Sequence, residues 1–184
     1  MATMILLPDS ESLVAPHWVI VGSESTRWES LLTDNGTTSY VSCDDNLADM
    51  PINFADPDDV TPANGGVAEA DIASYESVRF LSSGKSVHRT NPARVQIGYT
   101  SPDYSTHDEI VAYDAHRTAW ETINGTARTT HDGTHPWDYS RISGMQLTCI
   151  KVQTLQVYLT YLAIEVTYTP AVAADNATFF GANF

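Results

Sequence analysis

Short apolar or alternating runs, separated by turn residues at fairly regular intervals, dominate the pattern of this chain. Such a pattern is typical of all-β sandwiches, in which alternate side chains of each strand face the core. The runs predicted as strands are 17–21, 38–43, 50–54, 72–80, 94–99, 109–113 and 120–123. Helical periodicity is weak throughout, and a single turn at residues 28–32 would satisfy it.

The final predicted strand has the most specific pattern. Residues 153–170 read QTLQVYLTYLAIEVTYTP, and the run ends at Pro170. A strand this long and this rich in β-branched and aromatic residues needs neighbours on both sides, so we expect it in the middle of a sheet. Residues 135–147, before it, are predicted as a turn followed by a bridging segment.

Two stretches lack the composition of a regular element. Residues 55–71 contain two prolines, two adjacent glycines and several acids, which predicts a long exposed loop. Residues 126–136 are polar and are expected to form a loop that delivers Trp137.

The length of 184 residues favours one domain, because a chain of this size buries about 70% of its unfolded surface. We predict an all-β fold, an antiparallel and jelly-roll-like β-sandwich over residues 17–170. Residues 1–16 and 171–184 lie outside the strand pattern and are predicted as an N-terminal and a C-terminal arm. Phe179, Phe180 and Phe184 would be exposed on a free arm, so we expect them to dock on the sandwich, a neighbouring subunit or another partner.

The charge is strongly acidic, with a formal net charge of −14. Because phosphate binding relies on Lys and Arg, this balance argues against nucleic acid and anionic membrane as partners. Few lysines, many threonines and an excess of Asp over Glu resemble proteins that work in concentrated salt; an ordinary acidic surface protein is the alternative. The N-terminus lacks the basic region of a signal peptide, and no apolar run approaches the roughly 18 residues of a membrane span.

Metal and cofactor binding have weak support. His131 and His135 have the spacing of a zinc helix, but Gly133 and Pro136 make a helix improbable and favour a polar loop. The acidic runs 44–45 and 56–59 could bind calcium, yet neither matches an EF-hand, so solvated loops are expected. Cys43 and Cys149 match no metal spacing and are predicted as buried free thiols, with one disulfide as the alternative. We expect no cofactor and no metal.

No pattern of catalytic residues stands out. A GxSxG elbow is absent from the sequence, and nothing selects one carboxylate pair from the twenty-three acids present. We therefore expect a protein that is not an enzyme. The sequons at Asn35, Asn124 and Asn176 leave glycosylation open, although the first two are also Asn-Gly turns.

Aromatic residues in or near predicted loops offer one further possibility. Ring faces can stack on the CH groups of sugars, while burial in the sandwich core is the commoner fate of Trp and Tyr. The residues considered for such a sugar platform are Trp120, Trp137, Tyr104, Tyr113 and Tyr139.

The order of these signals resembles a β-sandwich found among structural proteins of tailed viruses of bacteria and archaea. The positions that carry the resemblance are Trp18, 28–41, 72–80, 136–137, 142–147 and 165–168. The chain departs from that pattern at residues 153–156, where an arginine commonly stands near the start of the last strand.

The resemblance implies a virion protein that decorates or cements the capsid, with a halophilic archaeal virus as one candidate source. Such a protein would be a homotrimer that binds the major capsid protein through its arms and stabilises the shell without catalysis. The alternative is a tail, neck or fibre component with a glycan-binding sandwich for host attachment. A free carbohydrate-binding module is a third and weaker reading.

Overall fold

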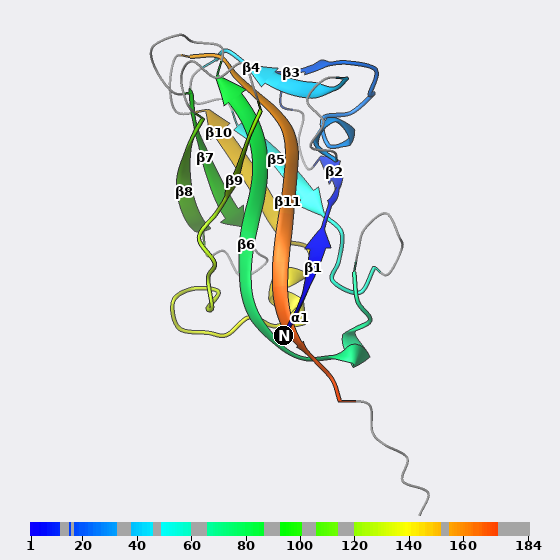
Figure 1. Ribbon diagram of the computed structural model, residues 1–184. Coiled ribbons are helices and arrows are strands. Elements are labelled where there is room, and N and C mark those ends of the chain that lie inside the picture. Colours follow the sequence, from blue (N-terminus) through cyan, green and yellow to red (C-terminus); the bar gives the residue numbers. More distant parts are fainter. Residues whose placement is uncertain are drawn as a thin grey trace, which may run out of the picture.

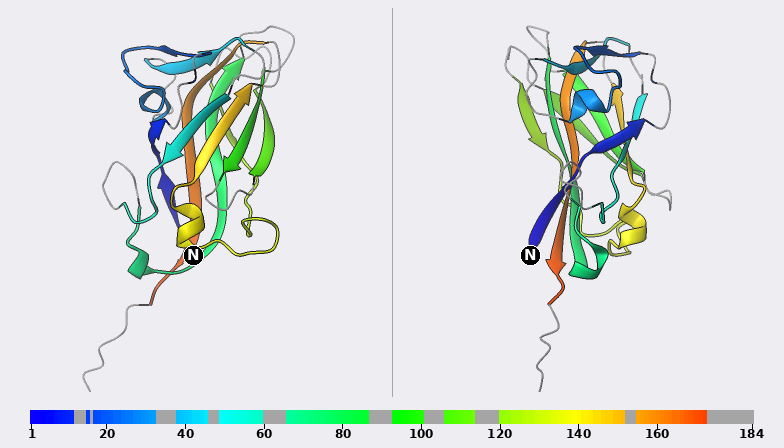
Figure 2. Two further views of the ribbon diagram at one scale, coloured as in Figure 1. Left: turned by 180° about the vertical axis from the view of Figure 1, so that it is seen from behind. Right: turned by 90° about the vertical axis from the view of Figure 1, so that its right-hand side faces the viewer.

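The computed structural model describes residues 1–11, 15, 17–32, 38–45, 49–59, 66–86, 93–100, 106–113, 120–151 and 155–172. In this part of the chain, two antiparallel sheets enclose one apolar core (Figure 1). Figure 2 shows the same arrangement from behind and from the side. None of the described helices is long and apolar enough to cross a membrane.

Both sheets are built from strands that lie far apart in the sequence. Sheet A has the order β3 (Trp18–Val21), β4 (Tyr40–Cys43), β11 (Val157–Pro170), β6 (Ile72–Ser86) and β9 (Glu121–Asn124), with β1 (Ala2–Leu6) also paired to β11. Sheet B has the order β2 (Pro8–Glu11), β5 (Asp49–Phe54), β10 (Gln146–Lys151), β7 (Ala93–Thr100) and β8 (Thr106–Tyr113).

The strand order is that of a jelly roll. From β4 to β11 the chain forms the row β4-β11-β6-β9 in sheet A and the row β5-β10-β7-β8 in sheet B. In each row the late strand, β11 or β10, lies between two early strands, as in the two Greek keys of a jelly roll. The predicted antiparallel, jelly-roll-like sandwich is confirmed.

Strand β11 holds sheet A together. It pairs with β6 along its whole length, while its other side pairs with β4 near its start and with β1 over Ile164–Tyr168. Its alternate residues Leu162, Ile164 and Val166 are completely buried. The prediction of a long central strand that ends at a proline is therefore confirmed.

The N-terminal residues correct the sequence prediction of an arm over residues 1–16. Ala2–Leu6 forms β1 in sheet A, with Met4 and Leu6 buried, and Pro8–Glu11 forms β2 on the edge of sheet B. These strands are short, and β2 is mostly polar, so neither has the apolar alternation that marks a strand in sequence. Their stability comes from pairing with β11 and β5.

Three further elements differ from the prediction in kind or extent, and a fourth agrees with it. The bridging segment contains β10, and a short helix α1 (Tyr139–Ile142) precedes it, with Asp138 as its N-cap. Strand β6 extends beyond residue 80 through the sequence LSSGKS, which carries no apolar alternation. The single turn expected at 28–32 is present as the 3₁₀ turn η1 (Glu29–Leu31).

Three buried side chains that carry a thiol or an amine lie on β4 and β10. Cys43 and Cys149 are both buried and free, as predicted, and burial raises the pKa of the Cys149 thiol to about 12. Lys151 is also completely buried, and its ammonium group donates a hydrogen bond to the backbone oxygen of Asp44. This hydrogen bond compensates part of the cost of removing the amine from water.

Candidate functional site

The loop aromatics considered for sugar binding separate into two regions at opposite ends of the sandwich. Trp120 directly precedes β9, whose first residue pairs with Gly84 near the end of β6, whereas Tyr139 begins α1 and Trp137 comes two residues earlier. The end of β6 and α1 lie at the upper and lower ends of the sandwich in Figure 1. Tyr104 and the side chain of Tyr113 lie outside the described residues.

The lower pocket is a recess of about 390 Å³ between the start of β6 and the segment that enters α1. The 3₁₀ turn η2 (Glu69–Asp71) forms its rim on one side. The lining residues are Glu69, Ile72, Ala73, Ser74, Tyr75, Pro136, Trp137, Asp138 and Tyr139. Its volume lies within the range of ordinary small-molecule sites.

The indole of Trp137 is held rigidly as one wall of the lower pocket. Its Nε1 donates a hydrogen bond of 2.8 Å to the backbone oxygen of Arg128, and its ring meets the His131 ring edge-on at 5.3 Å. Only 4% of the residue is exposed. The polar loop before it delivers Trp137 to this position, as the sequence predicted.

The other polar side chains of the lower pocket differ in whether they already form hydrogen bonds within the protein. The Asp138 carboxylate accepts hydrogen bonds from the backbone nitrogen of Arg141 and the hydroxyl of Ser140, and it pairs with the Arg141 guanidinium. The Tyr139 hydroxyl donates to Asp58 at 2.7 Å, and this bond is the main cause of its raised pKa. Glu69 is exposed and makes no side-chain hydrogen bond within the described part of the chain.

Tyr75 is the unusual residue of the lower pocket. Its ring packs against the core, but its hydroxyl is buried and has no hydrogen-bond partner among the described residues. Burial, with a smaller contribution from the charge of Glu69, raises the pKa of this phenol to about 12. A buried unpaired hydroxyl costs about 1–3 kcal/mol, so it requires an explanation.

The upper cluster consists of Tyr40, Lys85, Trp120 and Tyr158. Lys85 on β6 lies directly opposite Tyr158 on β11. Its Nζ lies 4.5 Å from the centroid of the Trp120 ring, 5.5 Å from that of Tyr158 and 5.9 Å from that of Tyr40. The rings also contact one another, with centroids 5.0 Å apart for Tyr40 and Tyr158 and 5.6 Å for Tyr40 and Trp120.

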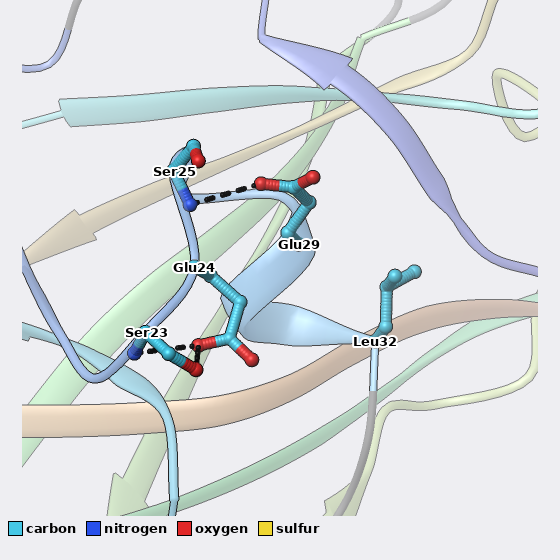
Figure 3. A pocket seen from close by; sticks show the side chains of 5 residues that line it. All are labelled: Ser23, Glu24, Ser25, Glu29 and Leu32. Atoms are coloured by element: carbon cyan, nitrogen blue, oxygen red, sulfur yellow. Dashed lines mark hydrogen bonds between the residues drawn. The ribbon is translucent and has the colours of Figure 1, made fainter.

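A second recess, of about 360 Å³, lies beside η1 and is lined by Ser23, Glu24, Ser25, Glu29 and Leu32 (Figure 3). Glu29 accepts hydrogen bonds from the backbone of Ser25 and from both the backbone and hydroxyl of Thr26, which lower its pKa. Glu24 accepts hydrogen bonds from the backbone nitrogen and hydroxyl of Ser23. These carboxylates hold their own loop, so the recess is not a strong ligand site.

The candidate metal residues have local structural roles. His131 is buried beside Trp137, whereas the exposed His135 ring contacts Asp132 at 2.7 Å. The two residues close a turn in which the backbone nitrogen of His131 donates to the backbone oxygen of His135. This turn does not place both imidazoles on one helical face.

The acidic runs are likewise tied into the fold where they are described. Asp56 accepts hydrogen bonds from the Ser143 hydroxyl and the Gly144 backbone nitrogen, and Asp58 accepts from Tyr139. Asp45 pairs with His17. Among the described residues, no group of three or more His, Cys, Asp or Glu side chains could hold a metal ion.

Several predicted positions lie outside the described residues: Asn35, Asn176 and the aromatic residues Phe179, Phe180 and Phe184. The partner interface assigned to these phenylalanines therefore stays a prediction. Asn124 is described as the exposed last residue of β9.

A search with the sequence finds no matching family model and no matching curated protein. Among solved structures, the chain is similar to a family 11 carbohydrate-binding module from Clostridium thermocellum in complex with a β-1,3-1,4-mixed-linked tetrasaccharide. The identity is 13%, the TM-score is 0.43, and the match covers 89% of this chain and 96% of that one.

Two further similarities have comparable values. A family 30 carbohydrate-binding module of a Clostridium thermocellum cellulosomal cellulase matches with 9% identity and a TM-score of 0.42, over 89% of this chain and 92% of that one. The enzymatically active domain of tailspike protein 4 from bacteriophage CBA120 matches with 6% identity and a TM-score of 0.41, over 84% of this chain and 20% of that one. These distant likenesses concern the fold and do not identify a ligand.

Proposed function

We propose that this chain is a non-catalytic glycan-binding β-sandwich and that the lower pocket holds one sugar unit. The observation that carries the proposal is the Tyr75 hydroxyl, which is buried in the pocket lining without a partner. Like an ordinary tyrosine, this phenol is protonated at neutral pH, and it is therefore a hydrogen-bond donor; burial raises its pKa further, to about 12. A ligand hydroxyl that displaces the part of the lining that covers this oxygen would supply the missing acceptor.

The lining suits the two kinds of surface that a sugar ring presents. The CH groups of the ring can pack on the aromatic wall formed by Trp137 and Tyr139. Its hydroxyls can accept from Tyr75 and donate to the carboxylate of Glu69. A pocket with apolar walls and a few directed polar groups is the general form of a small-molecule site.

The same contacts argue against hydrolysis of the bound sugar. A glycosidase commonly needs two carboxyl groups that act on the glycosidic bond as acid and as base or nucleophile. Glu69 and Asp138 both line the pocket, but Asp138 is already bound to Arg141 and Ser140. This arrangement leaves Glu69 to bind hydroxyls without a catalytic partner.

The biological setting follows from the resemblance and stays a proposal. Glycan binding favours the tail, neck or fibre of a virion, where the protein would attach to host sugars. For capsid decoration through the major capsid protein, the predicted interface at Phe179, Phe180 and Phe184 lies outside the described residues, and we place this role second. Removal of residues 173–184 would separate the two, because decoration should be lost whereas sugar binding should persist.

The decisive experiment substitutes Tyr75→Phe, which removes the hydroxyl and keeps the ring. A glycan array first selects a ligand, and calorimetry then measures its affinity for both proteins. We expect the variant to bind about tenfold more weakly, because one hydrogen bond is lost. Its thermal stability should stay unchanged or rise, because the hydroxyl has no partner within the described protein.

For a neutral glycan, Tyr158→Phe is the matched control, because it keeps the ring and removes a hydroxyl that donates to Gln156 at 3.1 Å, at the opposite end of the sandwich. It should leave the affinity unchanged. Equal affinity of wild type and Tyr75→Phe for every glycan on the array would refute the lower pocket as the site. Absence of any glycan binding would refute the proposed function.

A further inference from the structure

The outer face of sheet A carries an apolar surface that the lower pocket does not explain. Val19 and Val21 on the edge strand β3 are 55% and 36% exposed. They pair with Ser42 and Tyr40, and Ser42 lies opposite Tyr158 on β11. The valines and the aromatic rings of the upper cluster therefore share one face of the sheet.

Lys85 lies among these rings without an acidic partner in the described part of the chain. This is unusual in a protein where acids outnumber bases by 23 to 9. Arg79 on the same strand provides an internal comparison, since it lies opposite Glu165 on β11 and binds that carboxylate at 2.7 Å. At the equivalent cross-strand position Lys85 meets Tyr158 instead.

Three rings within 6 Å stabilise the ammonium group by cation–π attraction and restrict its position. The positive charge is thus fixed beside an apolar surface before any ligand arrives. Prior ordering of a long side chain lowers the entropic cost of binding an anion. The low polarity around the rings strengthens attraction to a ligand's negative charge.

We infer that the outer face of sheet A around Lys85 is a second binding surface, which takes a carboxylate-bearing glycan. The carboxylate of a uronic acid unit would pair with Lys85. The CH groups of the sugar rings would lie on the apolar surface formed by Tyr40, Tyr158 and the β3 valines. This surface stands on observations independent of the lower pocket.

The test uses trigalacturonate and its methyl ester, which share one carbohydrate backbone and differ in charge. We expect the wild-type protein to bind the acid at least tenfold more tightly than the ester. In Lys85→Gln this difference should disappear, and in Lys85→Arg it should largely return. Arg79→Gln is the control that removes a cation from the same strand, and it should preserve the wild-type preference.

Other outcomes overturn the inference. It fails if acid and ester bind equally, or if Arg79→Gln weakens binding of the acid as much as Lys85→Gln. It also fails if light scattering shows that the wild-type protein is an oligomer and that Lys85→Gln converts it to a monomer, because Lys85 would then serve a contact between copies of the chain. Loss of trigalacturonate binding in Tyr75→Phe, with Lys85→Gln unaffected, would refute the second surface and leave the lower pocket standing.

Discussion

The lower pocket and the upper cluster use the same aromatic residue types in opposite ways. In the lower pocket, a buried indole and two phenols surround a recess whose polar groups are acids and hydroxyls. In the upper cluster, three partly exposed rings surround one ammonium group on an open sheet face. The neighbouring polar group, rather than the ring itself, therefore determines which ligand an aromatic surface suits.

The largest expected difference between the two regions concerns stability. Trp137→Ala should destabilise the fold by about 3–5 kcal/mol, because it empties a buried wall and leaves the Arg128 carbonyl without its indole donor. Trp120→Ala should cost much less, because that ring is only half-buried. Chemical denaturation of both variants measures the difference, and equal losses would contradict the assignment of Trp120 to a surface.

The next largest difference concerns salt, which should weaken ligand binding at one of the two surfaces more than at the other. Attraction between Lys85 and a uronate weakens as the Debye length falls from about 10 Å at 0.1 M to about 3 Å at 1 M salt. We expect trigalacturonate affinity to fall severalfold over this range. Binding of a neutral glycan in the lower pocket should change less than twofold, and calorimetry across the salt series compares them.

A smaller effect is expected from alkaline pH. The folded-state pKa of Tyr75 is about 12, above the ordinary value of 10, so the phenol keeps its proton at pH values where unfolded tyrosine ionises. Its contribution to stability is present below the ordinary pKa and is lost as the pH rises through the folded-state value. Thermal melting above pH 10 should therefore fall less steeply with rising pH in Tyr75→Phe than in wild type. Equal pH dependence of the two proteins would contradict the raised pKa.

The smallest predicted effect lies at the recess of Figure 3, outside both regions. Hydrogen bonds from Thr26 lower the pKa of Glu29, so its charged form stabilises the folded loop above the ordinary carboxyl pKa. This contribution is lost as the pH falls through the lowered folded-state value. Glu29→Gln should slightly lower the melting temperature at neutral pH, and the difference should vanish in strong acid. The affinity for the neutral glycan and the affinity for trigalacturonate should both stay unchanged.

Strands can be predicted from this sequence where they are long, or where one face is apolar and the other is polar. Strand β11 is the clearest case, because its apolar residues alternate over most of its length. The sequence does not predict β1, β2 and β10 as strands, because each takes its stability from partners distant in the sequence. Local pattern contains no information about such pairing.

The two candidate sites were less accessible to sequence reasoning. Trp137 and Tyr139 were recognised as loop aromatics, but the orientation of the Tyr75 hydroxyl depends on how η2 and the α1 segment meet. The sequence gives no indication that Lys85 binds a ligand. Its position among aromatic rings depends on Tyr158, which lies opposite Lys85 only because β6 pairs with β11. An acidic residue at that cross-strand position would have made Lys85 an ordinary ion pair.

The burial of Lys151 has a practical consequence for chemical labelling. The chain has two lysines, and one of them is sealed in the core with its amine bound to Asp44. Of the two lysines, amine-reactive reagents should therefore attach at Lys85. Immobilisation through amines would place a linker on the outer face of sheet A, so sensor measurements of that face need attachment through another group.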